Sequence, residues 1–149
     1  MIAPGEQAPG FTLSDQDGED LSLSDFRGGR VMLVFYPADF SPVCTDQLSI
    51  YQEVLPDIEE KGAKLLGISV DNQWAHKAFQ EKLGVSIPLL ADFHPKGAVA
   101  ESYGAYLPDW GTSNRSLVLI DGQGTVEWVH AEDSPLSIPG ANLIFDALA

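Results

Sequence analysis

The stretch Val31-Met32-Leu33-Val34-Phe35-Tyr36-Pro37-Ala38-Asp39-Phe40-Ser41-Pro42-Val43-Cys44-Thr45 decides the fold of this chain. Residues 31–36 form an uninterrupted apolar run, which is typical of a strand buried on both faces of a sheet. Ser41 is a favourable helix N-cap, and proline suits the first helical position, which Pro42 would occupy. The sequence therefore predicts a buried strand, a short loop and a helix that begins just before Cys44.

Cys44, the only cysteine of the chain, would lie in the first turn of this helix. The backbone N–H groups there lack intrahelical acceptors, and the positive end of the helix dipole lies nearby. Both features favour a thiolate, the nucleophilic form of cysteine. The spacing of Cys44, Leu48 and Tyr51 also puts the thiol on the core-facing side of the helix. A structural core thiol and a reactive thiol facing a pocket are therefore both open interpretations.

Length and charge limit the classes of protein. A chain of 149 residues suits one domain, and we expect a single domain over 1–149. Its 22 acidic and 8 basic residues give a net charge of -14, which argues against nucleic acid and anionic membranes as partners. Residues 1–6 lack the features of a secretory signal, and no apolar run reaches transmembrane length. With one cysteine there is no internal disulfide framework, so we expect a cytoplasmic protein.

Strands and helices alternate along the rest of the chain and end in a hairpin, which predicts an α/β domain with a mixed sheet. The helix after Cys44 contains Pro56, which should kink or interrupt it, and Gly62 should end it. A later helix should begin at Asp71 or Asn72, end at Gly84 and turn Ala75, Ala78, Phe79 and Leu83 inward. The other expected elements are a hairpin of 11–13 and 21–23, strands 63–70 and 87–91, a helix within 95–103, a loop over 105–114, strands 116–121 and 125–130, and a helix over 141–148.

Most cofactor-dependent chemistry has no signature here. His76, His94 and His130 are scattered and lack ligand spacing, so we expect no metal site. Phosphate-binding and dinucleotide motifs are absent, so we expect no cofactor. A Cys-x-x-Cys pair is also absent, which argues against thioredoxin-type disulfide exchange. A Cys–His hydrolase stays open, although nothing in the sequence marks a histidine as its partner.

Pro37, Ser41 and Cys44 follow the pattern Pro, three residues, Thr or Ser, two residues, Cys. This pattern resembles the active-site loop of the peroxiredoxins. The segment 39–45 is similar to the one-cysteine members, and most of all to the bacterial alkyl hydroperoxidase E branch. The resemblance covers nearly the whole chain. It implies a thioredoxin-like fold, with helices flanking a mixed central β-sheet and an added N-terminal β-hairpin.

The resemblance also implies roles for four residues. Arg115, at the start of the 116–121 strand, would contact the cysteine, favour its thiolate and donate to a peroxide oxygen. Ser41 would hydrogen-bond the peroxide as well as cap the helix, and Pro37 would shield the thiolate from water. Plainer alternatives are a surface salt bridge for Arg115, capping alone for Ser41 and a strand stop at Pro37. One departure from the family is Gln47, where many relatives carry the glutamate that orients the arginine.

The function implied is a thiol-dependent peroxidase that reduces hydrogen peroxide and organic hydroperoxides through a Cys44 sulfenic acid. Some relatives carry a resolving cysteine where this chain has Ser49, so the pattern is of the one-cysteine type. The reductant would be an external thiol, either a low-molecular-weight thiol or a thioredoxin- or glutaredoxin-like protein. Two alternatives are a redox sensor or chaperone-like binding protein and an inactive thioredoxin-fold interaction module. We also expect a homodimer, with Trp74, Tyr106, Leu107 and Trp110 as large apolar groups outside the core pattern.

Overall fold

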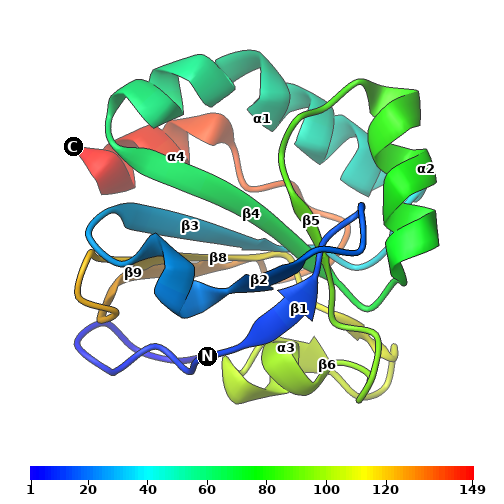
Figure 1. Ribbon diagram of the computed structural model, residues 1–149, viewed down its shortest axis with the longest axis horizontal. Helices are drawn as coiled ribbons and strands as arrows, with labels where there is room; N and C mark the ends of the chain where they lie inside the picture. The colour runs from blue at the N-terminus through cyan, green and yellow to red at the C-terminus, as the bar shows by residue number, and fades with distance from the viewer.

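The computed structural model describes residues 1–149 as an α/β fold (Figure 1). Its elements, in chain order, are β1 (Thr12–Ser14), β2 (Asp20–Ser22), the 3-10 helix η1 (Leu23–Phe26), β3 (Arg30–Phe35), α1 (Pro42–Glu60), β4 (Ala63–Ser69), α2 (Gln73–Leu83), β5 (Leu89–Ala91), α3 (Ala98–Ser102), β6 (Tyr106–Leu107), β7 (Thr112–Ser113), β8 (Ser116–Ile120), β9 (Val126–Ala131) and α4 (Ala141–Leu148). None of the helices combines the length and apolar character needed to cross a bilayer.

The predicted apolar run forms β3, the middle strand of a five-stranded mixed sheet with the order β5-β4-β3-β8-β9. β4 pairs with β3 in parallel, and β8 pairs with it antiparallel. Residues 31–36 are all buried, as expected for a strand that is covered on both faces. Because β3 lies at the centre, the loop at its carboxyl end emerges in the middle of one edge of the sheet.

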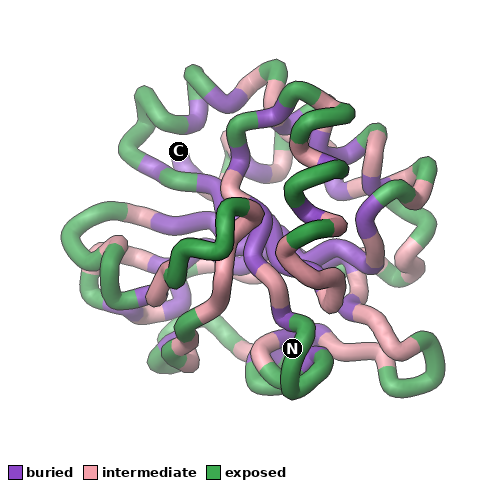
Figure 2. Tube along the Cα trace, turned by 45° about the vertical axis from the view of Figure 1, so that its right-hand side comes forward, coloured by how far each residue is buried: buried purple, intermediate pink, exposed green.

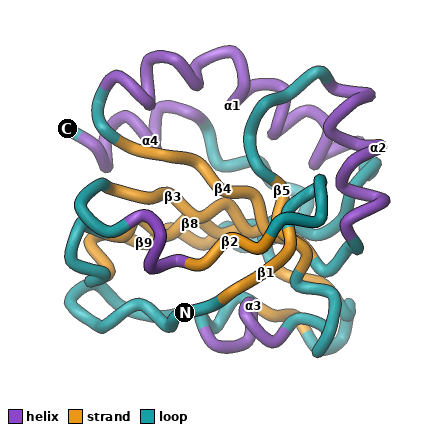
Figure 3. Tube along the Cα trace, viewed as in Figure 1, coloured by secondary structure: helices purple, strands orange, loops and turns teal.

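Helices cover both faces of this sheet (Figures 1 and 3). α1 and α4 pack over one face, in a core cluster that contains Tyr36, Cys44 and Leu48. The other face is covered by α3, the N-terminal segment and the predicted β1–β2 hairpin, in a cluster around Phe35 and Tyr103. The two clusters alternate along β3, since successive side chains of a strand point to opposite faces. Buried residues accordingly concentrate along the central strands in Figure 2.

Three expectations about local structure are wrong in part. α1 is continuous through Pro56, which lies on the exposed side of the helix, where water can hydrate the carbonyl that the proline leaves without a donor. In α2, Ala78 is exposed, and His76 is buried instead with Phe79, because the inward side includes a polar residue that apolar periodicity overlooks. The 105–114 segment is not only a loop, since β6 and β7 pair as a two-stranded ladder within it.

Two further elements are shorter in the structure than the sequence predicted. The strand expected over 87–91 is β5, which begins at Leu89, and the helix expected within 95–103 is the shorter α3. Both elements are short, and the ends of short elements are poorly marked by sequence pattern. The mixed α/β class, the N-terminal hairpin, the β8–β9 hairpin and the C-terminal helix are confirmed.

Candidate active site

The loop after β3 delivers Cys44 to the start of α1 in the predicted way. Ser41 has extended backbone angles, and its Oγ accepts a hydrogen bond of 3.1 Å from the backbone N–H of Cys44. The hydroxyl of Thr45 donates to the Ser41 carbonyl at 2.9 Å and braces the same turn. Pro37, at the other end of the loop, is buried. The expected N-cap is therefore confirmed, and Cys44 lies in the first helical turn.

Arg115 reaches Cys44 because β8 runs antiparallel to β3. Phe35 pairs with Ser116, so the residue before β8 lies beside the carboxyl end of β3, where the loop begins. The arginine is only 1% exposed. Its Nη2 donates to the Cys44 Sγ at 3.0 Å, and its Nε donates to the Pro135 carbonyl at 2.5 Å. The contact that the family resemblance implied is thus present, and the surface salt-bridge alternative for Arg115 is wrong.

Gln47 accepts the third hydrogen bond from the guanidinium group. Its Oε1 lies 2.6 Å from Nη1 of Arg115, and its Nε2 donates to the Tyr51 hydroxyl at 3.2 Å. The Tyr51 hydroxyl donates in turn to the Pro139 carbonyl at 2.6 Å. Burial raises the pKa of Tyr51 to about 12, so the phenol keeps its proton at neutral pH. Gln47 therefore orients Arg115 through a neutral hydrogen bond and is itself fixed by Tyr51.

No carboxylate lies within ion-pair distance of Arg115. Its three acceptors are the Cys44 sulfur, the Gln47 amide and a backbone carbonyl, and it takes part in no ion pair with an acidic residue. Cys44 is the one ionisable group among these three partners. The guanidinium group places a fixed positive charge 3.0 Å from the sulfur, and the thiolate is the reactive form of cysteine.

Cys44 is also a core residue, as its place in the helix predicted. It is fully buried and belongs to the same cluster as Leu48 and Tyr51. The two open interpretations of the thiol are therefore compatible, because one side of the side chain packs in the core while the sulfur accepts from Arg115.

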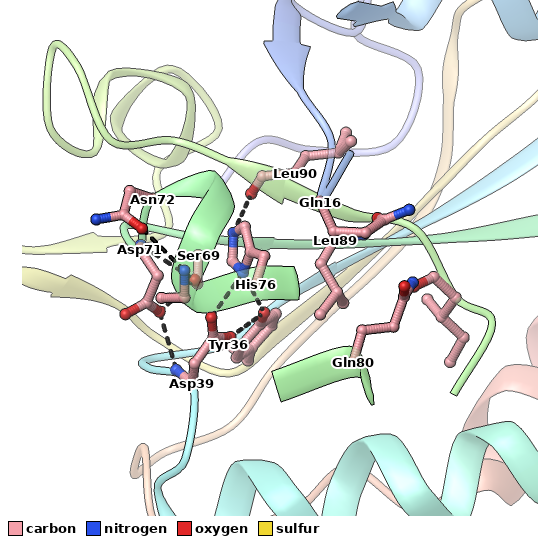
Figure 4. A network of polar contacts seen from close by, with 12 residues as sticks. Gln16, Tyr36, Asp39, Ser69, Asp71, Asn72, His76, Gln80, Leu89 and Leu90 are labelled. Atoms are coloured by element: carbon pink, nitrogen blue, oxygen red, sulfur yellow. Dashed lines mark hydrogen bonds and ion pairs between the residues drawn. The ribbon is translucent and has the colours of Figure 1, made fainter. Parts of the chain in front are cut away.

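The sequence did not reveal a second polar cluster next to the loop, formed by Tyr36, Asp39, Asp71 and His76 (Figure 4). Atoms of Asp39, Asp71 and His76 lie within 4.8 Å of one another, close enough to hold a metal ion in principle. Both ring nitrogens of His76 and both carboxylates already have hydrogen-bond partners, so no unpartnered ligand points into the cluster. We therefore assign no metal to it. Asp39 lies within the motif itself and could have drawn attention as a polar residue between two prolines.

A change at Gln47 tests how Arg115 is held. Gln47→Leu should lower the free energy of unfolding by about 1–3 kcal/mol, because it leaves a buried guanidinium N–H without an acceptor. The rate of Cys44 oxidation should fall as well. Gln47→Glu is the matched variant, since its carboxylate can still accept from Arg115. Urea unfolding and peroxide kinetics on both variants check this, and equal loss in the two would contradict an anchoring role.

Comparisons with known proteins identify the family of this chain. A sequence model of the AhpC/TSA family matches residues 4–129. Alkyl hydroperoxide reductase E of Mycobacterium tuberculosis is 35% identical over 150 residues, covering 100% of this chain and 97% of that protein. Chloroplastic peroxiredoxin Q of Triticum aestivum is 37% identical over 130 residues, covering 87% of this chain and 59% of that protein. The crystal structure of peroxidoxin BcpB from Mycobacterium tuberculosis superposes with a TM-score of 0.88 at 27% identity, covering 99% of this chain and 97% of that one.

Proposed function

The chain belongs to the AhpC/TSA family, and we propose that this thiol-dependent peroxidase works through Cys44 with Arg115, Ser41 and Pro37 around the sulfur. The family supports the peroxidase activity, and its thioredoxin-like fold accounts for the mixed sheet described above. The observation that carries the assignment of residues is the 3.0 Å contact between Nη2 of Arg115 and the Cys44 sulfur. The two alternatives, a redox sensor and an inactive interaction module, are not favoured by these relatives.

The reaction begins with attack of the Cys44 thiolate on one peroxide oxygen. A sulfur–oxygen bond forms while the oxygen–oxygen bond breaks, so sulfur is oxidised and the peroxide is reduced. The departing oxygen takes up a proton and leaves as water from hydrogen peroxide, or as an alcohol from an organic hydroperoxide. Cys44 becomes a sulfenic acid, which is the first and reversible stage of thiol oxidation.

Arg115 and Ser41 would act on the peroxide during this step. The guanidinium group is planar and keeps its proton, so it can donate to the sulfur and to a peroxide oxygen together. Donors aimed at charge that develops in the transition state lower the barrier. The Ser41 hydroxyl, already close to the Cys44 backbone, could donate to the second peroxide oxygen. Pro37, which has no N–H, would shield one side of the thiolate from water.

Reduction of the sulfenic acid would need an external thiol, because the chain has no second cysteine. One thiol condenses with the sulfenic acid to give a mixed disulfide and water, and a second thiol displaces Cys44 as a thiolate. A low-molecular-weight thiol or a thioredoxin- or glutaredoxin-like protein could serve. Because this cycle depends on a reducing thiol pool, we propose a cytoplasmic protein that works as one domain over 1–149.

Stopped-flow kinetics test the proposal directly. The reduced protein should consume several equivalents of hydrogen peroxide or an organic hydroperoxide when a thiol reductant is present. A redox sensor would react once and then stop under the same conditions, and an inactive module would show a thiol of ordinary reactivity. Cys44→Ser should abolish turnover, because it removes the nucleophile.

We also propose that the protein forms a homodimer. Of the four large apolar residues expected outside the core, Trp74 and Trp110 are 73% and 59% exposed, and Phe93 is also exposed, at 54%. Tyr106 and Leu107 are only partly exposed, and Tyr106 packs against a core cluster. Large exposed apolar groups are common at interfaces between subunits, and symmetric dimers are the commonest oligomers. Light scattering at micromolar concentration should give a dimer mass. A monomer in both the reduced and oxidised states would contradict this expectation.

A further inference from the structure

We propose that His76 is a positioning residue for Cys44, acting through Asp39 to hold the 37–41 loop in its reactive conformation. The inference rests on the proposed function, since it concerns the geometry around the same sulfur. His76 contacts neither Cys44 nor its hydrogen-bond partners, so it acts through another residue. His76 can act on the loop because a series of buried hydrogen bonds joins α2 to it (Figure 4).

Asp39 is the loop residue at the end of this series of hydrogen bonds. Its side chain is 1% exposed, and its Oδ2 lies 2.7 Å from Nδ1 of His76. The other carboxylate oxygen, Oδ1, accepts a 2.7 Å hydrogen bond from the Tyr36 hydroxyl. Burial raises the pKa of Tyr36 well above its usual value, so the phenol stays a donor. Asp39 is thus held by Tyr36, which directly follows β3, and by His76 of α2.

His76 is itself fixed from its other side. Its Nε2 lies 3.0 Å from the Leu90 carbonyl of β5, and its side chain is fully buried. A carbonyl oxygen only accepts, so Nε2 carries a hydrogen. The other ring nitrogen, Nδ1, makes the contact with Asp39. With both ring nitrogens in hydrogen bonds, the imidazole is held in one orientation.

The loop needs such an anchor because its backbone is strained. Phe40, which follows Asp39, has a φ of 66°, a left-handed conformation that costs a non-glycine residue on the order of 1–3 kcal/mol. Two more contacts hold this turn, one with the segment just before α2 and one with the interior of α2. The Asp39 N–H donates to the Asp71 carboxylate at 2.9 Å, and the Phe40 ring packs 5.0 Å from that of Phe79, centroid to centroid.

The position of this turn matters for the chemistry. Ser41 directly follows Phe40, and its hydroxyl accepts a hydrogen bond from the Cys44 N–H. A shift of the turn would move Ser41, and with it the peroxide relative to the sulfur and Arg115. Misplacement of a reacting group by ~1 Å can slow a reaction about 100-fold. Alkylation of the thiolate by iodoacetamide has no need of this peroxide geometry, so it reports on the thiol alone.

Two variants separate the two hydrogen bonds of His76. His76→Gln places an amide near the Nε2 position, where it can donate to Leu90, but leaves Asp39 without a donor from α2. His76→Asn places its amide near the Nδ1 position, where it can still donate to Asp39. His94→Gln is the matched control, since it makes the same chemical change at an exposed histidine. Each variant is compared with the wild type in peroxide oxidation and in alkylation at the same pH.

We expect His76→Gln to slow peroxide oxidation about 100-fold while alkylation changes far less, and His76→Asn to keep most of the peroxide rate. Equal loss in both variants, or a parallel fall in oxidation and alkylation, would overturn the inference. If wild-type Cys44 does not react with peroxide at all, the proposed function fails instead. These failures are distinct, because the second appears before any variant is made.

If His76→Gln does not fold, Tyr36→Phe tests the same inference in its place. This variant removes the hydroxyl that donates to Asp39 and lies 3.4 Å from Nδ1 of His76, while the ring packing is retained. We expect a slower peroxide reaction with nearly unchanged alkylation, and an unchanged peroxide rate would overturn the role of Asp39. In Asp39→Ala, adding His76→Gln should cause no further loss of peroxide rate, because the two residues act in series.

Discussion

Replacing Arg115 by lysine should lower the rate constant for peroxide reduction at least about tenfold while the protein stays folded. The guanidinium group donates to three acceptors at once, namely the Cys44 sulfur, Gln47 and the Pro135 carbonyl. A lysine ammonium keeps the positive charge but lacks the planar fork. It cannot reproduce these three directions and still donate to a peroxide oxygen. Stopped-flow oxidation of the reduced variant measures the effect.

Arg27→Lys is the matched control for this experiment, because Arg27 is exposed and precedes the amino end of β3, at the opposite end of the strand from the loop. Its peroxide kinetics should equal those of the wild type. Thermal unfolding of both variants then shows whether the fold is intact. Wild-type kinetics in a folded Arg115→Lys protein would mean that the contact with Cys44 is structural, and the assignment of Arg115 would fail.

One equivalent of peroxide, without any thiol, should add one oxygen atom to the intact mass of the reduced protein. With no second cysteine, the Cys44 sulfenic acid cannot close an intramolecular disulfide. Excess peroxide should carry the sulfur on to sulfinic and sulfonic acids. A small thiol added early should instead give a mixed disulfide, which a second thiol releases. Mass spectrometry of the intact chain follows each of these products.

Cys44→Ser is the necessary control, because methionine can also gain an oxygen. Met32 is fully buried and Met1 is 46% exposed, so any sulfoxide should form first at Met1. The variant should gain no oxygen at one equivalent. A disulfide between the Cys44 residues of two chains as the main product would contradict the external-thiol cycle. No change of mass in the wild type would contradict peroxidase activity through Cys44.

Much of the fold followed from patterns within a few residues of one another. The apolar run that became β3, the capping by Ser41 and the end of α2 at Gly84 are all local signals, and each is found where predicted. Errors arose where tertiary packing decided the outcome. His76 is buried in place of Ala78 because its ring nitrogens find hydrogen-bond partners on β5 and in the loop, and hydrophobic periodicity carries no information about such partners.

The sequence by itself determined that one thiol stands at the start of a helix, directly after a strand buried in the sheet. Resemblance to a family added Arg115, but neither spacing nor composition joins it to Cys44. Only the antiparallel pairing of β3 with β8 brings these two residues, 71 positions apart, within 3.0 Å. The same holds for His76 and Asp39, 37 positions apart. Capping depends on neighbours along the chain, whereas the partners of a buried polar group depend on which strands and helices pack together.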